Sequence, residues 1–294
     1  MPRLGAHMSI TGGLPLAIER ANAAGCECLQ IFTKSSGQWR ARPLPPAEIS
    51  AFREGMDVTD VRPVFAHASY LINLASPDDT LRDRSMAALG EEMDRAEALG
   101  LAGVVLHPGS FTTATPEQGL RRIADATVSV LRPRATFDTR LLLEHTAGQG
   151  TNLGHTFEQL EVIIKEAEGA GAPVLGLCLD TCHLVAAGYE LSEQAGYDDT
   201  LGELDTRIGL ERVSLWHLND SKTPRGSRVD RHTHIGAGHV GLDGFRHVLT
   251  VPRFADHPMV LETPKAGNRR AGGVEADEMD LENLRTLRQL LADR

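Results

Sequence analysis

Short apolar runs rich in valine, isoleucine, leucine and phenylalanine recur along the chain, and amphipathic stretches separate them. The runs are nearly continuous rather than alternating, which is typical of parallel strands that are covered on both faces. From the third run to the seventh, the ends follow at steps of roughly 37 residues, which suits a repeat of strand, loop and helix. We interpret eight runs as strands: 3–7, 28–33, 63–67, 103–107, 140–144, 174–180, 213–217 and 258–262.

The segments between the runs carry helix signals. After the third run, Ser76 offers an N-cap, Pro77 a first helical position, and Asp79 an acidic residue in the first turn. Apolar residues then recur near the helical period up to Leu99, and Gly100 can end the helix. Similar patterns predict helices within 12–25, 157–171 and 281–291.

Eight strands that alternate with helices predict a single α/β domain over residues 1–294, a closed parallel (β/α)8 TIM barrel. Such a barrel typically needs about 250 residues and places its active site at the C-terminal ends of the strands. An open doubly wound sheet is the alternative, but the first strand is not followed by the glycine-rich phosphate-binding motif of that fold.

Composition narrows the class of protein. The chain has 40 acidic against 30 basic residues and a formal net charge of -10, which argues against binding to nucleic acid through overall charge. Basic residues gathered locally around an active site would still be compatible with this net charge. The four cysteines form no zinc-knuckle or disulfide pattern, and the sequence offers neither a signal peptide nor a membrane span. We expect a reduced, cytoplasmic protein without a membrane partner.

The chemistry is concentrated where the predicted strands end. An apolar strand that ends in a polar, ionisable residue needs a compensating partner for that residue. In a barrel, these ends converge on the C-terminal face. From the third strand to the eighth, each strand ends in a residue that can bind a metal: His67, His107, Glu144, Asp180, His217 and Glu262.

Three further candidates lie close by along the chain, namely His183, Asp230 and His232. Taken singly, each histidine could be a hydrogen-bonded core residue, and each carboxylate could pair with an arginine. Their equivalent positions on successive strands favour a metal site instead. Nine ligands are too many for one zinc ion, which takes about four, so two or three metals with a bridging carboxylate are expected.

At these residues the chain resembles the endonuclease IV family, the metal-dependent apurinic/apyrimidinic endonucleases of base excision repair. The resemblance extends over nearly the whole chain. It is carried by GAH (5–7), GGL (12–14), HASYLIN (67–73), LHPG (106–109), LEHTAGQG (143–150), LDTCH (179–183), HLNDSK (217–222), SRVDRH (227–232), IGAG (235–238) and LETP (261–264).

The resemblance implies a TIM barrel with three zinc ions, although Mn²⁺ or Fe²⁺ could share some of the sites. It assigns the ligands of the first metal to His67, His107 and Glu144, those of the second to Glu144, Asp180, His217 and Glu262, and those of the third to His183, Asp230 and His232. We expect Glu144 and Glu262 to be catalytic by orienting the attacking water, and His7, at the end of the first strand, to support the ligands.

The expected reaction is hydrolysis of the phosphodiester 5′ to an abasic site in double-stranded DNA, which leaves a 3′-hydroxyl and a 5′-deoxyribose phosphate. A monomer without an obligate protein partner is expected. Tyr70 is expected to probe the duplex, whereas Gly37 stands where the family carries a DNA-inserting arginine. Further DNA contacts are expected from loop residues, foremost Lys34, Trp39, Arg228 and Arg231, and also Arg40, Lys222, Arg225, Lys265, Arg269 and Arg270.

Two other functions compete with this interpretation. A xylose-isomerase-like sugar isomerase or epimerase with one or two metals would use only Glu144, Asp180, His217 and Glu262. The other five candidate ligands favour the phosphodiesterase. A non-catalytic DNA- or metal-binding barrel is the second alternative, with Gly37 as its only support.

Overall fold

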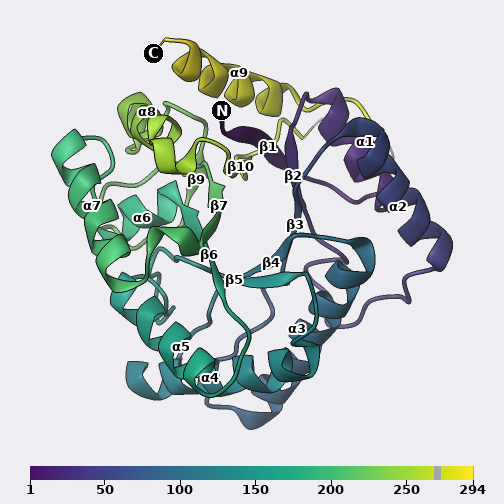
Figure 1. Ribbon diagram of the computed structural model, residues 1–294. Coiled ribbons are helices and arrows are strands. Elements are labelled where there is room, and N and C mark those ends of the chain that lie inside the picture. Colours follow the sequence, from purple (N-terminus) through teal and green to yellow (C-terminus); the bar gives the residue numbers. More distant parts are fainter. Residues whose placement is uncertain (268–272, 294) are drawn as a thin grey trace.

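The computed structural model describes residues 1–267 and 273–293, and its centre is a closed barrel of parallel strands (Figure 1). The strands follow one another around the barrel in chain order, and β1 pairs with β10 to close it. This confirms the expected TIM barrel. The barrel strands are β1 (Arg3–Met8), β2 (Cys28–Ile31), β3 (Val64–His67), β4 (Gly103–Leu106), β5 (Arg140–Glu144), β6 (Gly176–Asp180), β7 (Val213–His217) and β10 (Pro258–Leu261).

Helices surround the barrel and connect its strands (Figure 1). Within the described part of the chain, none of them is long and apolar enough to cross a membrane. A short antiparallel pair, β8 (Asp220–Ser221) and β9 (His232–Thr233), follows β7. The α-helices are α1 (Pro15–Ala23), α2 (Pro46–Thr59), α3 (Asp79–Leu99), α4 (Pro116–Leu131), α5 (Phe157–Gly169), α6 (Thr181–Ala187), α7 (Gln194–Arg207), α8 (Gly241–Thr250) and α9 (Glu278–Ala292), with short 3-10 turns at Arg132–Arg134, Leu210–Arg212 and Pro252–Phe254.

An apolar layer fills the inside of the barrel. Seven buried side chains form a cluster that is separate from the larger core between barrel and helices, and each comes from a different strand. On β1, Gly5 takes the corresponding position, and no side chain fits there, because a Cβ atom on Gly5 would lie 2.0 Å from the backbone oxygen of Cys28. The seven residues are Cys28, Phe65, Val105, Leu142, Cys178, Leu215 and Val260.

The start of α3 differs from the prediction. The N-cap predicted at Ser76 is wrong: Asp78 caps the helix, and its carboxylate accepts the backbone N–H of Leu81 at 3.1 Å. Ser76 instead accepts the N–H of Asp78 and closes the turn before the helix. At the other end, Gly100 has a φ of 73° and ends the helix as predicted.

Candidate metal centre

The layer of side chains above the apolar cluster is polar. Side chains two residues apart on a strand point to the same face. Each member of the apolar layer is therefore followed, two positions later, by an inward-facing polar residue at the C-terminal end of its strand, and His7 stands in the same relation to Gly5. The polar layer consists of His7, Gln30, His67, His107, Glu144, Asp180, His217 and Glu262.

Glu144 lies at the centre of this layer and is fully buried. Its Oε2 atom lies 3.1 Å from Nε2 of His67 and 3.0 Å from Nε2 of His107. Its Oε1 atom lies 3.1 Å from Nδ1 of His217 and 3.3 Å from Nδ1 of His183. One carboxylate thus joins side chains that the resemblance assigns to the first, second and third metals.

The second group consists of Glu144 and His217 together with Asp180 and Glu262. Nδ1 of His217 lies 3.2 Å from Oε2 of Glu262 and 3.8 Å from Oδ2 of Asp180. Asp180 is also the N-cap of α6, where its Oδ1 atom accepts the backbone N–H of His183 at 2.9 Å. This cap explains the Asp-x-x-His spacing, because it fixes the helical turn that carries His183 beside the strand end.

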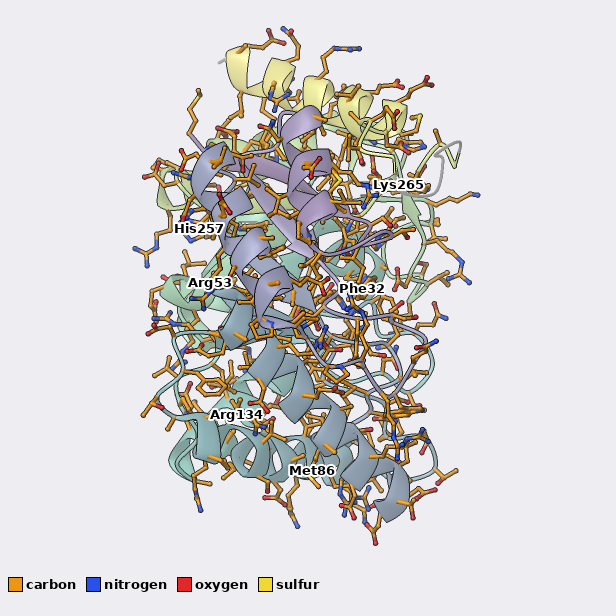
Figure 2. The ribbon with its side chains drawn as sticks, turned by 90° about the vertical axis from the view of Figure 1, so that its right-hand side faces the viewer. Phe32, Arg53, Met86, Arg134, His257 and Lys265 are labelled. Atoms are coloured by element: carbon orange, nitrogen blue, oxygen red, sulfur yellow. The ribbon has the colours of Figure 1, made fainter. Side chains whose placement is uncertain are left out.

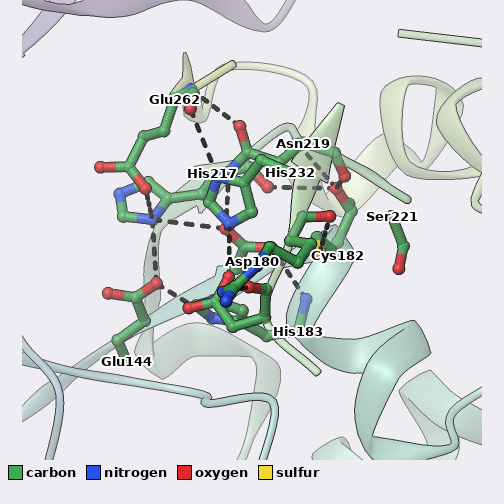
Figure 3. A network of polar contacts seen from close by, with 12 residues as sticks. Glu144, Asp180, Cys182, His183, His217, Asn219, Ser221, His232 and Glu262 are labelled. Carbon is green, nitrogen blue, oxygen red and sulfur yellow. Dashed lines mark hydrogen bonds and ion pairs between the residues drawn. The ribbon is translucent and has the colours of Figure 1, made fainter. Parts of the chain in front are cut away.

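The third group combines α6 with the loop after β7 (Figure 3). Nε2 of His183 lies 3.2 Å from one oxygen of Asp230, and Nε2 of His232 lies 3.3 Å from the other. Both nitrogens are buried and make no hydrogen bond within the described residues. A cation that binds imidazole nitrogens and carboxylate oxygens would satisfy both.

The structure brings the nine candidate ligands together in the three groups that the resemblance implies. In each group, one ligand atom per residue lies within 4.8 Å of the others. Histidine and carboxylate donors at this spacing fit a zinc-type site. Cys182 forms a further group with Asp180 and His232, but burial raises the pKa of its thiol to about 12, and a neutral thiol is a poor ligand.

The charges in the centre depend on one another. Burial alone would raise the pKa of Glu144, but the imidazoles of His107 and His217 hold it well below its usual value. Burial would likewise lower the pKa of His183, and the nearby Asp180 carboxylate holds it well above its usual value instead. The metal-free centre therefore keeps Glu144 ionised, and protons on His183 and His217, whose pKa values are both raised, occupy positions that cations would take.

Three polar residues near the centre escaped the sequence analysis. Gln30, inside β2, contacts His7, His217 and Glu262. Asn219 donates from Nδ2 to Oδ2 of Asp180 at 2.6 Å, and its Oδ1 atom accepts the backbone N–H of Glu262. Asp220 is fully buried and accepts four backbone N–H groups.

A polar residue within an apolar run was the available signal for Gln30. For Asn219 and Asp220, the only signal in the sequence was the run of polar residues directly after the seventh strand. His7 also contacts the centre, with Nδ1 3.6 Å from Oε1 of Glu262.

The residues expected to contact DNA lie in different environments. Tyr70 is 61% exposed, and its ring lies 5.0 Å from that of His67 and 5.8 Å from that of His107. Lys34 is buried, with its Nζ atom 3.4 Å from Oε1 of Glu92 and 2.9 Å from the backbone oxygen of Gln38. The ammonium of Lys34 thus faces inward and holds its own loop in the DNA-free chain, and its contact with DNA stays a prediction.

The remaining expected DNA contacts also differ in exposure. Trp39 is half-buried under the guanidinium of Arg84, whose carbon lies 4.3 Å from the ring centre. Arg228 and Arg231 are exposed on the loop after β7. Arg225 and Lys265 are ion-paired with Glu190 and Asp280, respectively. Arg269 and Arg270 lie outside the described residues, whereas Arg40, Lys222 and Gly37 are exposed.

Known proteins are similar to this chain in sequence and in fold. Residues 18–290 match the family model of the xylose isomerase-like TIM barrel. The chain is also 47% identical to a protein of Trichlorobacter lovleyi named Probable endonuclease 4, over 98% of this chain and 99% of that protein. The chain belongs to the endonuclease IV family. It is therefore an enzyme of this family, and the resemblance expected from the sequence is confirmed.

Solved structures with the same fold differ in how similar their sequences are to this chain. The endonuclease IV of Thermus thermophilus superposes with a TM-score of 0.85 at 39% identity and covers all of both chains. A D-tagatose 3-epimerase-like protein superposes with a TM-score of 0.74 at only 16% identity, over 99% of this chain and 97% of that one. The second likeness shows a common fold alone and does not favour an epimerase function.

Proposed function

We propose that this endonuclease IV family member acts in DNA base excision repair, where it hydrolyses the phosphodiester 5′ to an abasic site in double-stranded DNA. It would use a centre of three metal ions and leave a 3′-hydroxyl and a 5′-deoxyribose phosphate. The observation that carries the proposal is the meeting of nine buried or half-buried ligand side chains in three adjoining groups at the mouth of the barrel.

The donor set is the basis for the proposed metals. Histidine and carboxylate ligands without a thiolate suit Zn²⁺, and Mn²⁺ or Fe²⁺ could occupy some positions. His67, His107 and Glu144 would hold the first ion, Glu144, Asp180, His217 and Glu262 the second, and His183, Asp230 and His232 the third. When bound, such ions neutralise the phosphoryl oxygens and lower the pKa of a bound water.

Glu144 and Glu262 would orient the attacking water. Burial would raise the pKa of Glu262, but the charge of His217 keeps that carboxyl ionised, as His107 and His217 do for Glu144. An ionised carboxylate only accepts hydrogen bonds, so each can hold a water proton and direct the oxygen lone pair towards phosphorus. No side-chain nucleophile is needed for this hydrolysis.

A cavity beside the first group could receive the substrate. It has a volume of about 320 Å³, and its lining includes His67, Tyr70, His107, Asn152 and Asp230. A nucleotide must leave the stack to reach it, and a missing base makes this cheaper. The exposed ring of Tyr70 stands at this cavity and could fill the gap left in the duplex.

The epimerase alternative accounts for fewer residues. It needs Glu144, Asp180, His217 and Glu262, but it gives no task to the pair of buried imidazole nitrogens that face Asp230. Three metal ions per purified chain would favour the phosphodiesterase. One or two ions, together with epimerisation of a ketose, would favour the alternative.

The decisive experiment compares the cleavage rates of matched variants. Glu144→Gln and Glu262→Gln are compared with Glu161→Gln, which removes a carboxylate on the outer helix α5. On a duplex with one abasic analogue, we expect the first two variants to lose about a hundred-fold or more in rate, a typical loss when a positioned acid or base is removed. Glu161→Gln should keep its rate. Near-normal cleavage by Glu144→Gln, or activity that survives a strong chelator, would refute the proposal.

A further inference from the structure

Gln30 occupies a place in the polar layer without being a ligand. It is the inward-facing residue of β2, fully buried, and stands one layer above Cys28. Its Nε2 atom lies 2.5 Å from Oε1 of Glu262 and 3.0 Å from Nδ1 of His7. Its Oε1 atom lies 2.8 Å from Nε2 of His217. These three contacts of the amide are all with residues of the polar layer.

The chemistry of its neighbours fixes the direction of the amide. An ionised carboxylate can only accept, so the group that faces Glu262 must be the NH₂ of Gln30. The amide oxygen is then left to face His217. Because that oxygen can only accept, Nε2 of His217 must carry a hydrogen and donate it.

This hydrogen bond decides what the other nitrogen of His217 can do. When a cation replaces the proton on Nδ1 of His217, the ring is neutral, and the hydrogen on Nε2 leaves the lone pair of Nδ1 free for the cation. Nδ1 faces carboxylate oxygens of Glu144 and Glu262 at 3.1 and 3.2 Å. A lone pair among anionic oxygens is repelled, unless a cation lies between them. Fixing this tautomer therefore prepares a cation site.

Other histidines of the centre are fixed in another way. His67 and His183 each place Nδ1 against a backbone oxygen, that of Ala68 at 2.7 Å and that of His145 at 2.9 Å. Nδ1 of His232 lies 3.3 Å from the backbone oxygen of Glu262. Among these described contacts, His217 alone depends on a side chain, so a single substitution can remove its partner.

We propose that Gln30 is a positioning residue that sets the tautomer of His217 and the rotamer of Glu262, and so presents both to the second metal ion. The inference rests on the metal centre of the proposed function. Partners of this kind typically contribute about 10- to 100-fold to metal affinity. In this chain the contribution would be concentrated on one of the metal positions, because Gln30 contacts ligands of the second group.

Two variants of Gln30 separate its roles. Gln30→Leu removes both the acceptor for His217 and the donor for Glu262. Gln30→Glu keeps an oxygen for His217 but faces Glu262 with a second carboxylate. Cys28→Ala is the matched control, because Cys28 lies on the same strand and face but belongs to the apolar layer. Circular dichroism and thermal unfolding establish that each variant is folded.

The readouts are zinc affinity and the state of the His217 ring. Zinc retained against chelators of graded strength is measured on each purified chain. Two-bond ¹H–¹⁵N spectra of chains labelled at histidine report the tautomer, with His217→Gln to assign the signals. We expect the zinc-loaded Gln30→Leu chain to bind one zinc about 10- to 100-fold more weakly and to show a shifted Nε2–H signal for His217, because that hydrogen has lost its acceptor. Gln30→Glu should keep that signal but also bind zinc more weakly, and Cys28→Ala should match the unaltered chain in both.

Several results would overturn the inference. Unchanged zinc affinity and an unchanged His217 signal in Gln30→Leu would do so, as would an equal loss of zinc in Cys28→Ala. If Gln30→Leu does not fold, loss of the Nε2–H signal in Gln30→Glu contradicts the assignment. Failure of the proposed function looks different, because the unaltered chain would then bind fewer than three metals or leave an abasic duplex intact.

Discussion

At the scale of single residues, protons on the imidazoles offset the carboxylates of the candidate metal centre when no metal is bound. His232 illustrates this, since its Nε2 atom lies 3.3 Å from Oδ1 of Asp230 and 3.6 Å from Oδ2 of Asp180. Burial alone would lower the pKa of His232, but the Asp180 carboxylate and Asp230 raise it to about 9. In the metal-free chain, the protonated ring therefore offsets two carboxylates over most of the physiological pH range.

The stability of the metal-free chain should consequently depend on pH. An unfolded histidine titrates near pH 6.5, so the stabilisation from His232 is complete below that pH and is lost as pH increases towards about 9. We expect the free energy of unfolding of the chelator-treated chain to fall by up to about 3 kcal/mol across this interval. Urea titrations at several pH values measure it.

His232→Gln is the control for this pH dependence. It removes the titrating ring, so its free energy of unfolding should change less between pH 6.5 and about 9. Added zinc should flatten the profile of the unaltered chain, because the cation then neutralises the carboxylates in place of the proton. Equal slopes for the variant and the unaltered metal-free chain would contradict the role given to His232.

At the scale of elements, the loop that follows β9, the strand of His232, is held by one buried carboxylate. Oδ1 of Asp220 accepts the backbone N–H groups of Ser221 and Val240, and Oδ2 accepts those of Gly236 and Gly238, all at 2.8–3.0 Å. The chain wraps so closely that a Cβ atom on Gly238 would lie 2.2 Å from a backbone oxygen. Asp220 thus fixes the return of the chain from β9 to α8.

Asp220→Asn should loosen this loop, although the two side chains have nearly the same volume. The new NH₂ group would face two backbone N–H donors that lose their acceptor, and each buried unpaired donor costs about 1–3 kcal/mol. We expect the free energy of unfolding to fall by about 2 kcal/mol or more, and the third metal to be held more weakly. Asp243→Asn, on the exposed face of α8, should change stability by less than about 0.5 kcal/mol. Equal effects of the two substitutions would rule out the assigned role.

At the scale of elements, the sequence predicted those features whose signal lies within one short segment of the chain. An apolar run that ends in an ionisable residue is readable from one segment, so the ligand-capable strand ends could be named before the barrel was known. Gln30 could not be assigned in this way, because its partner Glu262 lies 232 positions further along the chain. The cap of α3 failed for another reason: Ser76 and Asp78 are both good capping residues, and the path of the incoming turn decides between them.

At the scale of the whole molecule, the barrel has two unequal ends. His257 and Lys265 flank β10, and Figure 2 places them on opposite sides of the molecule. The metal centre belongs to the end where the strands finish. Arg228, on the loop after β7, is exposed at that end, whereas Arg253 precedes β10 and is exposed at the other. Because the net charge of the chain is -10, we expect DNA to be bound by local cations such as Arg228 at the end that carries the candidate metal centre.

Two substitutions test whether location rather than total charge governs DNA binding. Arg228→Gln and Arg253→Gln each remove one cation, so both make the formal net charge of -10 more negative by the same amount. A lost phosphate contact lowers affinity and reduces the salt dependence of binding by about one unit of slope. We therefore expect Arg228→Gln to bind an abasic duplex more weakly and with a shallower salt slope, while Arg253→Gln matches the unaltered chain. Equilibrium binding at several salt concentrations measures both, and equal weakening by the two variants would mean that overall charge, not the mouth of the barrel, controls the encounter.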